Sequence, residues 1–226
     1  MTQKVPQSMR VLLTYFGAFE GVPVNPTDRL AHAVHAHCEE HPEWAVEVIL
    51  QELPVVFGES ARRLNETIAA ETPDAVIALG VAVGRNKVSL ERVAINLDDA
   101  RIADTEGIQR KDSPIVADAP AAYFSTLPTR AVVEKAQALN LPAELSYTAG
   151  TYVCNHVFYS LMHAVAGTTI PAGFIHVPAL EFETGPQNQL VAHVDAGGVE
   201  GTAIPTISVE EAKQIITLAI LEISER

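Results

Sequence analysis

The sequence predicts a three-layer α/β/α sandwich with a twisted, mostly parallel sheet. Short apolar runs of strand length alternate along the 226 residues with amphipathic segments of helical length. Strands that alternate with helices form a largely parallel sheet whose two faces are both covered by helices. The chain contains no repeat, no low-complexity linker and no clear domain boundary, so residues 1–226 are expected to form a single domain.

The first half of the chain supplies three of the expected strands and two helices. The run RVLLTYF ends at a glycine, as buried strands do. Asn25, Pro26 and Thr27 are residue types that start helices, and the residues that follow them suit a helix. Segment 87–97, KVSLERVAINL, is expected to be extended. The expected strands are 10–16, 44–56 and 73–80, and the expected helices are 25–41 and 60–71.

The second half continues the alternation. Helices are expected at 129–140 and 152–164, and strands at 143–148 and 172–180. The last helix begins at Ser208, with Glu211 three residues later, which is the pattern of a capping box. Its apolar residues recur at helical spacing and form one buried stripe. They are Val209, Ala212, Ile216, Ala219, Ile220 and Ile223.

Composition limits the classes of partner. The formal net charge is −13 and aromatic residues make up 6% of the chain, so neither nucleic acid nor an anionic membrane surface is expected to bind. Two cysteines, Cys38 and Cys154, do not make a disulfide framework. The N-terminus lacks the apolar segment of a signal peptide, and no apolar run is long enough to span a membrane. We therefore expect a soluble cytoplasmic protein.

Cys154 stands where a loop turns into a helix, in the stretch YTAGTYVCNHVFYSLMH. The positive end of the helix dipole favours the thiolate, which is the nucleophilic form of cysteine. A thiol nucleophile also needs a base, and His176, near the end of a buried strand, is the best candidate. The alternatives are a cysteine that packs as a small apolar residue and a histidine that is satisfied within the core.

Other histidines raise the question of a metal site. His32, His35, Cys38 and His41 recur at helical spacing, but a metal also needs ligands from elsewhere in the fold. A solvated, mildly polar helix face explains this pattern better, and no metal or cofactor is predicted. His156 and His163 follow Cys154 on the same helix; His163 is nearly three turns away from the thiol, which favours a structural role.

Five sequence blocks resemble one family. They are VLLTYFGAFEGVPVNPT (11–27), VGRNKVSLERVAINLDDARI (83–102), APAAYFSTLP (119–128), TAGTYVCNH around Cys154, and GFIHVP (173–178). Together and in this order they resemble the type I pyroglutamyl peptidases, over about residues 10–222. That family comprises cysteine peptidases that remove pyroglutamate (5-oxoproline) from the N-terminus of peptides. Its members fold as an α/β sandwich, need no metal or cofactor, and commonly assemble as homodimers or homotetramers.

The resemblance implies a Cys-His-Glu triad. Cys154 would attack the scissile carbonyl and form an acyl-enzyme, and His176 would act as general base and then as general acid. Glu91 would orient the imidazole and stabilise its charged form. Without the resemblance, a surface carboxylate paired with Arg92 would be the better interpretation of Glu91.

The resemblance also assigns residues to substrate binding. Pyroglutamate is a small, neutral lactam, so an apolar slot with backbone polar groups suits it. The ring-binding aromatic residues correspond to Phe16, Phe19 and Tyr152, although core packing is the common use of such side chains. Arg85 and Arg101 correspond to family arginines that either support the site or form structural ion pairs, for which Asp98 and Asp99 are the candidate partners.

Several positions depart from the family pattern, and they keep two rival functions open. Tyr15 and Glu20 replace glycines, Ala18 replaces a proline, and Asp118-Ala119-Pro120 replaces Asp-Gly-Pro. Val81 and Val83 replace an amide or leucine and a glycine, and segment 181–206 looks longer than its family counterpart. One rival is a weak or inactive member that binds pyroglutamyl or related lactam ligands. The other is a nucleoside phosphorylase-like transferase, for which the chain lacks a convincing phosphate-binding glycine loop.

Overall fold

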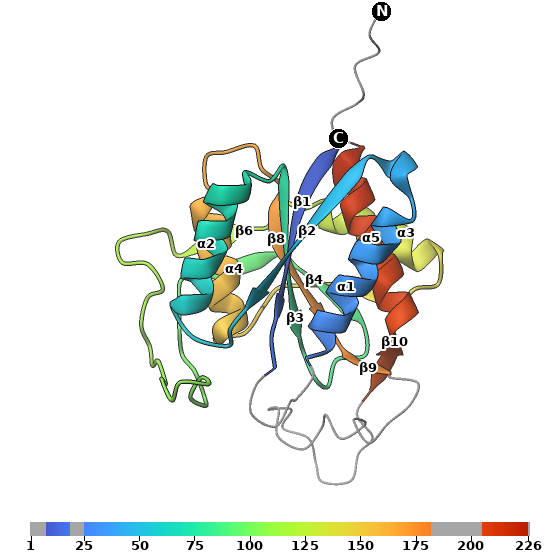
Figure 1. Cartoon of the computed structure of the whole chain (residues 1–226). Coiled ribbons are helices and arrows are strands. Elements are labelled where there is room, and N and C mark those ends of the chain that lie inside the picture. The colour runs from blue at the N-terminus through green and yellow to red at the C-terminus, as the bar shows by residue number, and fades with distance from the viewer. Residues whose placement is uncertain (1–7, 19–24, 182–204, 226) are drawn as a thin grey trace, which may run out of the picture.

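A six-stranded sheet forms the centre of the molecule, for which the computed structural model describes residues 8–18, 25–181 and 205–225 (Figure 1). The strand order is β2-β1-β3-β8-β4-β7. In chain order, the strands are β1 (Met9–Phe16), β2 (Val46–Leu53), β3 (Ala75–Val81), β4 (Val88–Glu91), β7 (Ala143–Ser146) and β8 (Ala172–Val177).

The sheet is mostly parallel, as the sequence predicts. Strands β2, β1, β3 and β8 run in one direction. Strands β4 and β7 are parallel to each other but antiparallel to β8, so this end of the sheet is reversed. The apolar pattern alone does not distinguish the two directions, because strands covered on both faces are apolar in either case.

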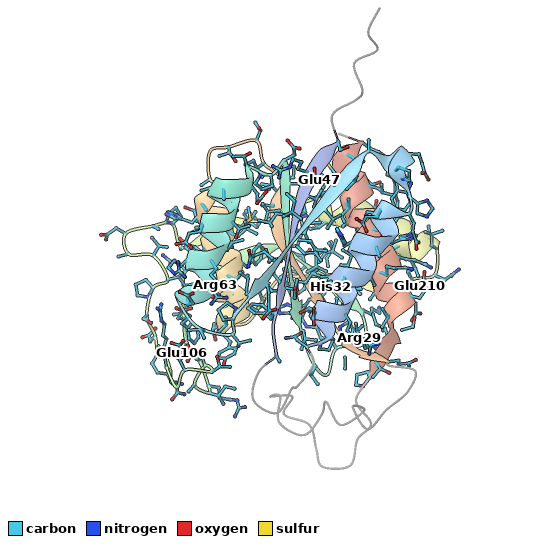
Figure 2. The ribbon with its side chains drawn as sticks, in the orientation of Figure 1. Arg29, His32, Glu47, Arg63, Glu106 and Glu210 are labelled. Atoms are coloured by element: carbon cyan, nitrogen blue, oxygen red, sulfur yellow. The ribbon has the colours of Figure 1, made fainter. Side chains whose placement is uncertain are left out.

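Helices cover both faces and produce two buried cores (Figure 1). Helices α1 (Pro26–Glu39), α3 (Thr129–Ala138) and α5 (Val209–Ser224) pack on one face, and α2 (Glu59–Glu71) and α4 (Val153–Ala164) pack on the other. Charged side chains lie on the outer sides of these helices, as Arg63 on α2 and Glu210 on α5 show (Figure 2). The three-layer sandwich is thereby confirmed. No helix in the described ranges is long and apolar enough to cross a membrane.

The predicted helix starts are present. Asn25 caps α1 by accepting a hydrogen bond from the Thr27 N–H at 3.1 Å, and Pro26 occupies the first turn. Ser208 and Glu211 form the reciprocal capping box of α5. Both caps satisfy backbone N–H groups that the first helical turn leaves unpaired.

Expected strand 44–56 begins later and ends earlier in the structure, and segments 87–97 and 172–180 each divide into two strands. A short 3-10 helix, η1 (Pro42–Trp44), precedes β2. Segment 87–97 divides into β4 and β5 (Val93–Ile95), and β5 pairs antiparallel with β6 (Ala122–Phe124). Segment 172–180 divides at Pro178, because proline has no N–H to donate to the ladder. The following β9 (Ala179–Glu181) pairs with β10 (Thr206–Ser208) instead.

The strand order defines the place where a ligand can bind. From β1 the sheet extends to β2 on one side and to β3 on the other, so the chain connections diverge between β1 and β3. In open α/β sheets, ligands bind outside the carboxyl ends of the strands at such a point. Phe16 ends β1 and Gly80 lies near the end of β3, so both belong to this edge.

Candidate active site

His176 and Glu91 form a buried pair on neighbouring strands. Ser89 of β4 is opposite His176 of β8, and Glu91 lies two residues farther along the same face. The Nδ1 atom of His176 is 2.7 Å from Oε1 of Glu91, and both side chains are almost completely buried. Because a carboxylate only accepts hydrogen bonds, Nδ1 carries the proton and Nε2 remains an acceptor. The pair therefore presents a fixed imidazole tautomer.

Arg85 reinforces this pair from the turn after β3. Its Nη1 donates to the same Glu91 oxygen at 2.8 Å, and its Nη2 donates to the backbone carbonyl of Thr148 at 3.1 Å. Arg85 thus links the carboxylate to the segment that leads into α4, the helix that carries Cys154.

Cys154 lies at the beginning of α4, with its sulfur above Gly80. A Cβ atom on Gly80 would be 3.0 Å from Sγ of Cys154 and 2.7 Å from the Phe174 ring, so only glycine leaves room here. Gly80 is the register partner of His176 in the neighbouring strand. Cys154 and His176 are therefore on the same face of the sheet, although 22 positions separate them in the sequence.

The chain segment that leads from β7 to Cys154 differs from the sequence-based expectation. A fully parallel sheet would place the carboxyl end of the strand before Cys154 at the edge where β3 and β8 end. That expectation is wrong for β7, because it runs opposite to β8. Segment 147–152 instead leads back to the start of α4, and the Arg85 contact with Thr148 holds it there.

Burial determines the charge states of the site. Burial, followed by the nearby negative charge of Glu91, raises the pKa of Cys154 to about 12, although part of this residue reaches solvent. Arg85 and the Cys154 backbone N–H act in the opposite direction but are outweighed. The backbone at the helix start thus acts in the direction that the sequence predicts, but burial and Glu91 have the larger effect on the pKa of Cys154.

The two partners of the thiol have lowered pKa values. Burial lowers the pKa of His176 below its ordinary value, against the opposing effect of Glu91. For Glu91, burial acts upward, but the hydrogen bond and charge of His176, together with Arg85, bring its pKa below the ordinary value. The resting site thus contains a thiol, a neutral imidazole and a carboxylate.

The predicted substrate-binding residues have different positions. Phe16 is buried in the core cluster that also contains Phe174 and is packed against by Tyr152 and Cys154. Tyr152 directly precedes α4, contacts the Phe57 ring edge-to-face at 5.4 Å, and donates its hydroxyl to the Ala103 carbonyl at 3.0 Å. Phe19 lies outside the described residues.

Arg101 is in an exposed loop, where its carbonyl accepts a hydrogen bond from Gln109 at 2.7 Å. The ion pair of Asp98 is formed with Arg110 at 2.9 Å, and Lys111 approaches Asp99 at 3.9 Å. Arg85 pairs with Glu91 instead of either aspartate. A structural ion pair of Asp98 with Arg85 is therefore ruled out.

The departures from the family pattern lie mostly away from His176. Tyr15 is buried in the core on the α1 face, opposite the face that carries His176, and its ring contacts His32 at 5.5 Å. Val81 also packs against that core, and Val83 is in the turn after β3. Glu20 and residues 182–204 are outside the described residues.

The histidines of α1, and His41 two residues after its end, have partners within this part of the fold. His32 pairs with Asp28 at 3.0 Å, and His35 is 3.0 Å from the Val48 carbonyl. The His41 ring stacks on Trp44 at 4.3 Å. Cys38 is buried, and burial raises its pKa to about 11. These contacts account for the side chains as parts of a helix face.

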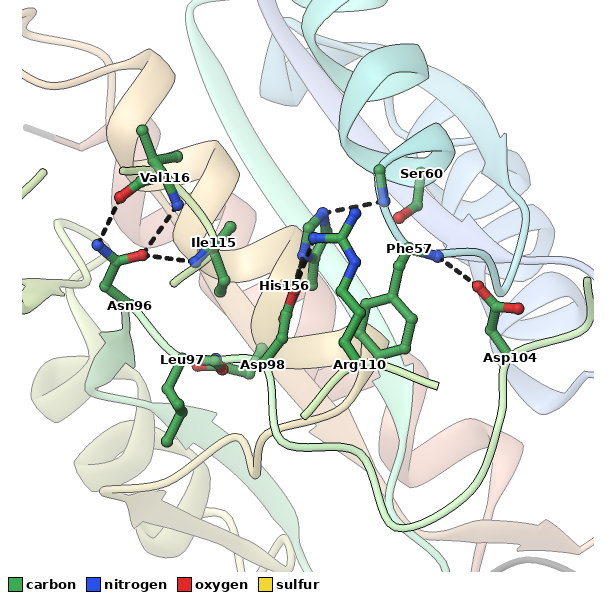
Figure 3. A network of polar contacts seen from close by, with 12 residues as sticks. Phe57, Ser60, Asn96, Leu97, Asp98, Asp104, Arg110, Ile115, Val116 and His156 are labelled. Carbon is green, nitrogen blue, oxygen red and sulfur yellow. Dashed lines mark hydrogen bonds and ion pairs between the residues drawn. The ribbon is translucent and has the colours of Figure 1, made fainter. Parts of the chain in front are cut away.

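The sequence pattern placed His156 on the helix of the nucleophile but gave it no role. His156 is buried in the first turn of α4, two residues after Cys154, where it bonds to Asp98, and Arg110 bonds to the same carboxylate (Figure 3). The partners are far apart in the sequence, and no spacing rule connects them. The only local signal was the polar pair Asn155 and His156 in an otherwise apolar helix.

Comparison with known proteins identifies the class of the chain as a peptidase. Residues 9–226 match the family model described as pyroglutamyl peptidase. The pyrrolidone-carboxylate peptidase 1 of Ralstonia nicotianae is 47% identical over 187 residues, covering 81% of this chain and 85% of that protein. The pyrrolidone-carboxylate peptidase of Bacillus thuringiensis is 46% identical over 172 residues, covering 75% and 78%.

Solved structures agree with this result. The crystal structure of Bacillus amyloliquefaciens pyroglutamyl peptidase I has a TM-score of 0.82 at 33% identity, covering 97% of this chain and 98% of that one. A mutant pyrrolidone carboxyl peptidase from the hyperthermophile Pyrococcus furiosus has a TM-score of 0.83 at 37% identity, covering 96% and 99%. The chain belongs to the pyroglutamyl peptidase family, and it is accordingly a hydrolase.

Proposed function

We propose that the protein removes N-terminal pyroglutamate from peptides through an acyl-enzyme formed on Cys154, with His176 and Glu91 completing the triad. One observation carries this proposal: the buried pair of His176 and Glu91, 2.7 Å apart, lies on the strand beside Gly80, above which the Cys154 sulfur sits. A thiol, an imidazole with a free Nε2 and an orienting carboxylate are the groups that nucleophilic acyl transfer requires.

In the first half-reaction, Nε2 of His176 takes the thiol proton while Sγ of Cys154 bonds to the pyroglutamyl carbonyl carbon. The C–N bond then breaks, and His176 gives its proton to the departing amine. In the second half-reaction, water gives a proton to His176 and attacks the thioester. The C–S bond breaks, pyroglutamic acid leaves, and the proton returns to sulfur.

Proton transfer within the bound complex is central to this mechanism. The pKa of Cys154 is raised and that of His176 is lowered, so the resting pair is neutral. Glu91 remains ionised and stabilises the imidazolium that forms during attack. The charged pair thus exists only while the reaction is in progress.

The start of α4 supplies the groups that stabilise the oxyanion. Tyr152 is the N-cap residue but makes no side-chain cap, and its hydroxyl bonds to Ala103. The backbone N–H groups of the first turn, around Cys154, are therefore available for the developing negative charge. Val81 has no amide to contribute, so the backbone carries this role.

Phe16 and Tyr152 support an apolar slot for the lactam ring, and Phe19 is proposed as its third aromatic member. Phe16 and Gly80 lie at the edge where the connections of β1 and β3 diverge, which suits a small neutral ring next to Cys154. The peptide substrate is the partner that this site implies. A homodimer or homotetramer in the cytoplasm remains our expectation for its assembly and location.

Hydrolysis of a fluorogenic pyroglutamyl amide tests the proposal. Cys154→Ser should fold normally and lose nearly all activity, because a serine hydroxyl is far harder to deprotonate than a thiol. Cys38→Ser is the matched control and should stay active, since Cys38 is buried on the opposite face in α1. Wild-type protein that binds the amide without releasing the fluorophore would instead support an inactive lactam-binding protein.

A further inference from the structure

His156 connects three parts of the fold outside the triad. It projects from α4 toward Asp98, and its Nδ1 is 2.9 Å from Oδ2 of that carboxylate (Figure 3). Its Nε2 accepts the Gly58 N–H at 3.1 Å, at the turn that begins α2. Arg110 bonds to the same Asp98 oxygen at 2.9 Å and lies over the Phe57 ring.

Both ring nitrogens of His156 therefore take part in hydrogen bonds. Because Gly58 donates to Nε2, the ring proton is on Nδ1, where it is donated to Asp98. Asp98 is fully buried, and Arg110, which is partly exposed, is its second partner. A buried carboxylate requires such partners, so the loss of His156 leaves Asp98 only partly satisfied.

Asp98 begins a loop that is organised within itself. Asp98 and Ser113 exchange two backbone hydrogen bonds, the Ala100 N–H bonds to the Arg110 carbonyl at 2.8 Å, and the Asp104 N–H bonds to the Ile108 carbonyl at 2.9 Å. These hydrogen bonds hold residues 98–113 together. We call this segment the 98–113 loop.

The 98–113 loop contacts the residues directly before the nucleophile. Thr151 exchanges two hydrogen bonds with Asp99, at 3.1 and 2.8 Å, and the Tyr152 hydroxyl bonds to Ala103. Helix α4 itself is held by its core side chains, including the fully buried Val157. Hydrogen bonds of Asp104 with Phe57 and of Thr105 with Val55 hold the far end of the loop. Loss of the His156 contact should consequently loosen the Asp98 end of the loop and leave the Cys154 helix in place.

We propose that His156, through Asp98, is a positioning residue that holds the 98–113 loop against Thr151 and Tyr152 and so shapes the substrate side of the site. This inference rests on the proposed function, because Tyr152 is taken to bind substrate. The side-chain hydrogen bonds of His156 go to Asp98 and Gly58, and not to His176 or Glu91. His156 acts through the loop, and its removal should affect substrate binding more than the chemical step.

The test compares three variants of the full chain. His156→Phe keeps a ring but removes both hydrogen bonds, whereas His156→Asn keeps a donor near the position of Nδ1. His163→Phe is the matched control, because His163 is on the same helix but bonds to the Tyr123 hydroxyl at 2.9 Å, far from the loop. The readouts are kcat and KM on a pyroglutamyl amide, tryptic cleavage after Lys111, and alkylation of Cys154.

For His156→Phe we expect KM and the rate of cleavage after Lys111 to rise about tenfold, as for the loss of one buried hydrogen bond to a charged group. The kcat and the alkylation rate should stay within about twofold. His156→Asn should recover most of the loss, and His163→Phe should resemble wild type. Arg110→Gln changes a partly exposed side chain, and it should shift KM and the rate of cleavage after Lys111 in the same direction. This variant replaces His156→Phe in the test if His156→Phe does not fold.

Unchanged KM and unchanged cleavage in His156→Phe, or in Arg110→Gln if the former does not fold, would overturn the inference. A fall in kcat and alkylation with KM unchanged would also overturn it, because His156 would then position the nucleophile. Failure of the proposed function looks different: wild type would release no fluorophore. Cleavage after Lys111 would still report on the loop in that case.

Discussion

Glu91 accepts two hydrogen bonds on one oxygen, from His176 at 2.7 Å and from Arg85 at 2.8 Å. Glu91 and Arg85 have opposite effects on the pKa of His176. Glu91 raises the pKa of His176, while Arg85 lowers the pKa values of both His176 and Cys154. The carboxylate of Glu91 and the guanidinium of Arg85 thus shift the pKa of the imidazole in opposite directions. The pH dependence of the rate can therefore distinguish their roles.

We predict that kcat/KM falls at acid pH as His176 becomes protonated, with a midpoint below the ordinary histidine value, because burial lowers the pKa of His176. Glu91→Gln removes an upward influence, so the acid limb should move to lower pH while the rate falls roughly 10²-fold or more. Arg85→Gln removes a downward influence, so the acid limb should move to higher pH. Rate profiles over pH measure both shifts.

Arg62→Gln is the control for these substitutions, because Arg62 is an exposed residue of α2 that pairs with Glu59 and Glu66. Its profile should match wild type. If Glu91→Gln left both the rate and the acid limb unchanged, Glu91 would have no place in the triad and another group would have to orient the imidazole.

At the scale of elements, helices were easier to predict than strand directions. Asn25 and Ser208 mark their helices because each cap is a local hydrogen-bond pattern that the sequence contains in full. The reversal of β4 and β7 depends on long-range pairing, which an apolar run does not encode. The divisions at Arg92 and Pro178 shortened two expected strands for the same reason, since the segments after them pair with new partners.

The site shows the same contrast. Cys154, His176, Glu91 and Arg85 could be proposed from motifs, and the structure brings the last three into direct hydrogen bonding. The contact of His156 with Asp98 spans 58 positions and depends on how the 98–113 loop folds onto α4. Only the folded chain reveals such a contact, because neither residue belongs to a pattern with its own spacing rule.

Gly80→Ala tests the packing of α4 on β3. The new Cβ would lie 2.7 Å from the buried Phe174 ring and 3.0 Å from Sγ of Cys154, so one of them must move. We expect unfolding stability to fall by about 1–3 kcal/mol, as for overpacked cores, and kcat/KM to fall at least tenfold. Urea denaturation and steady-state kinetics measure the two effects.

Gly167→Ala is the matched control for that substitution. Gly167 has a φ of +79° and open space around its Cβ position, so alanine there costs about 1 kcal/mol in backbone strain without touching Cys154. Its stability should fall while kcat/KM stays near wild type. Equal losses of activity in both variants would show that general destabilisation, and not the position of the sulfur, limits the rate.

At the scale of the whole molecule, the fold determines where a substrate can approach. The parallel strands β1, β3 and β8 end at one edge, helix α4 starts there, and the 98–113 loop flanks the residues before Cys154 (Figure 1). Apolar residues at this edge select a ring by shape, but polar contacts must distinguish a lactam from other small rings. Substrate discrimination is therefore the property that tests this arrangement as a whole.

We predict that a pyroglutamyl amide is cleaved at least about a hundredfold more efficiently, by kcat/KM, than the corresponding prolyl amide. Proline has a similar ring but carries a charged amine at neutral pH and lacks the lactam carbonyl. Backbone groups that bind the lactam would lose their partner, at about 1–3 kcal/mol for each buried group left unpaired. Comparable kcat/KM values for the two amides would indicate an iminopeptidase of broader specificity.

The central claim, an acyl-enzyme on Cys154, is tested most directly by mass spectrometry of the protein quenched in acid during turnover of a pyroglutamyl ester. Esters acylate a thiol readily, so hydrolysis of the thioester should limit the rate and the intermediate should accumulate. The account predicts the mass of one pyroglutamyl group on the peptide that contains Cys154, and none in Cys154→Ser. A pyroglutamyl group on any other residue, or turnover that persists in Cys154→Ser, would contradict it.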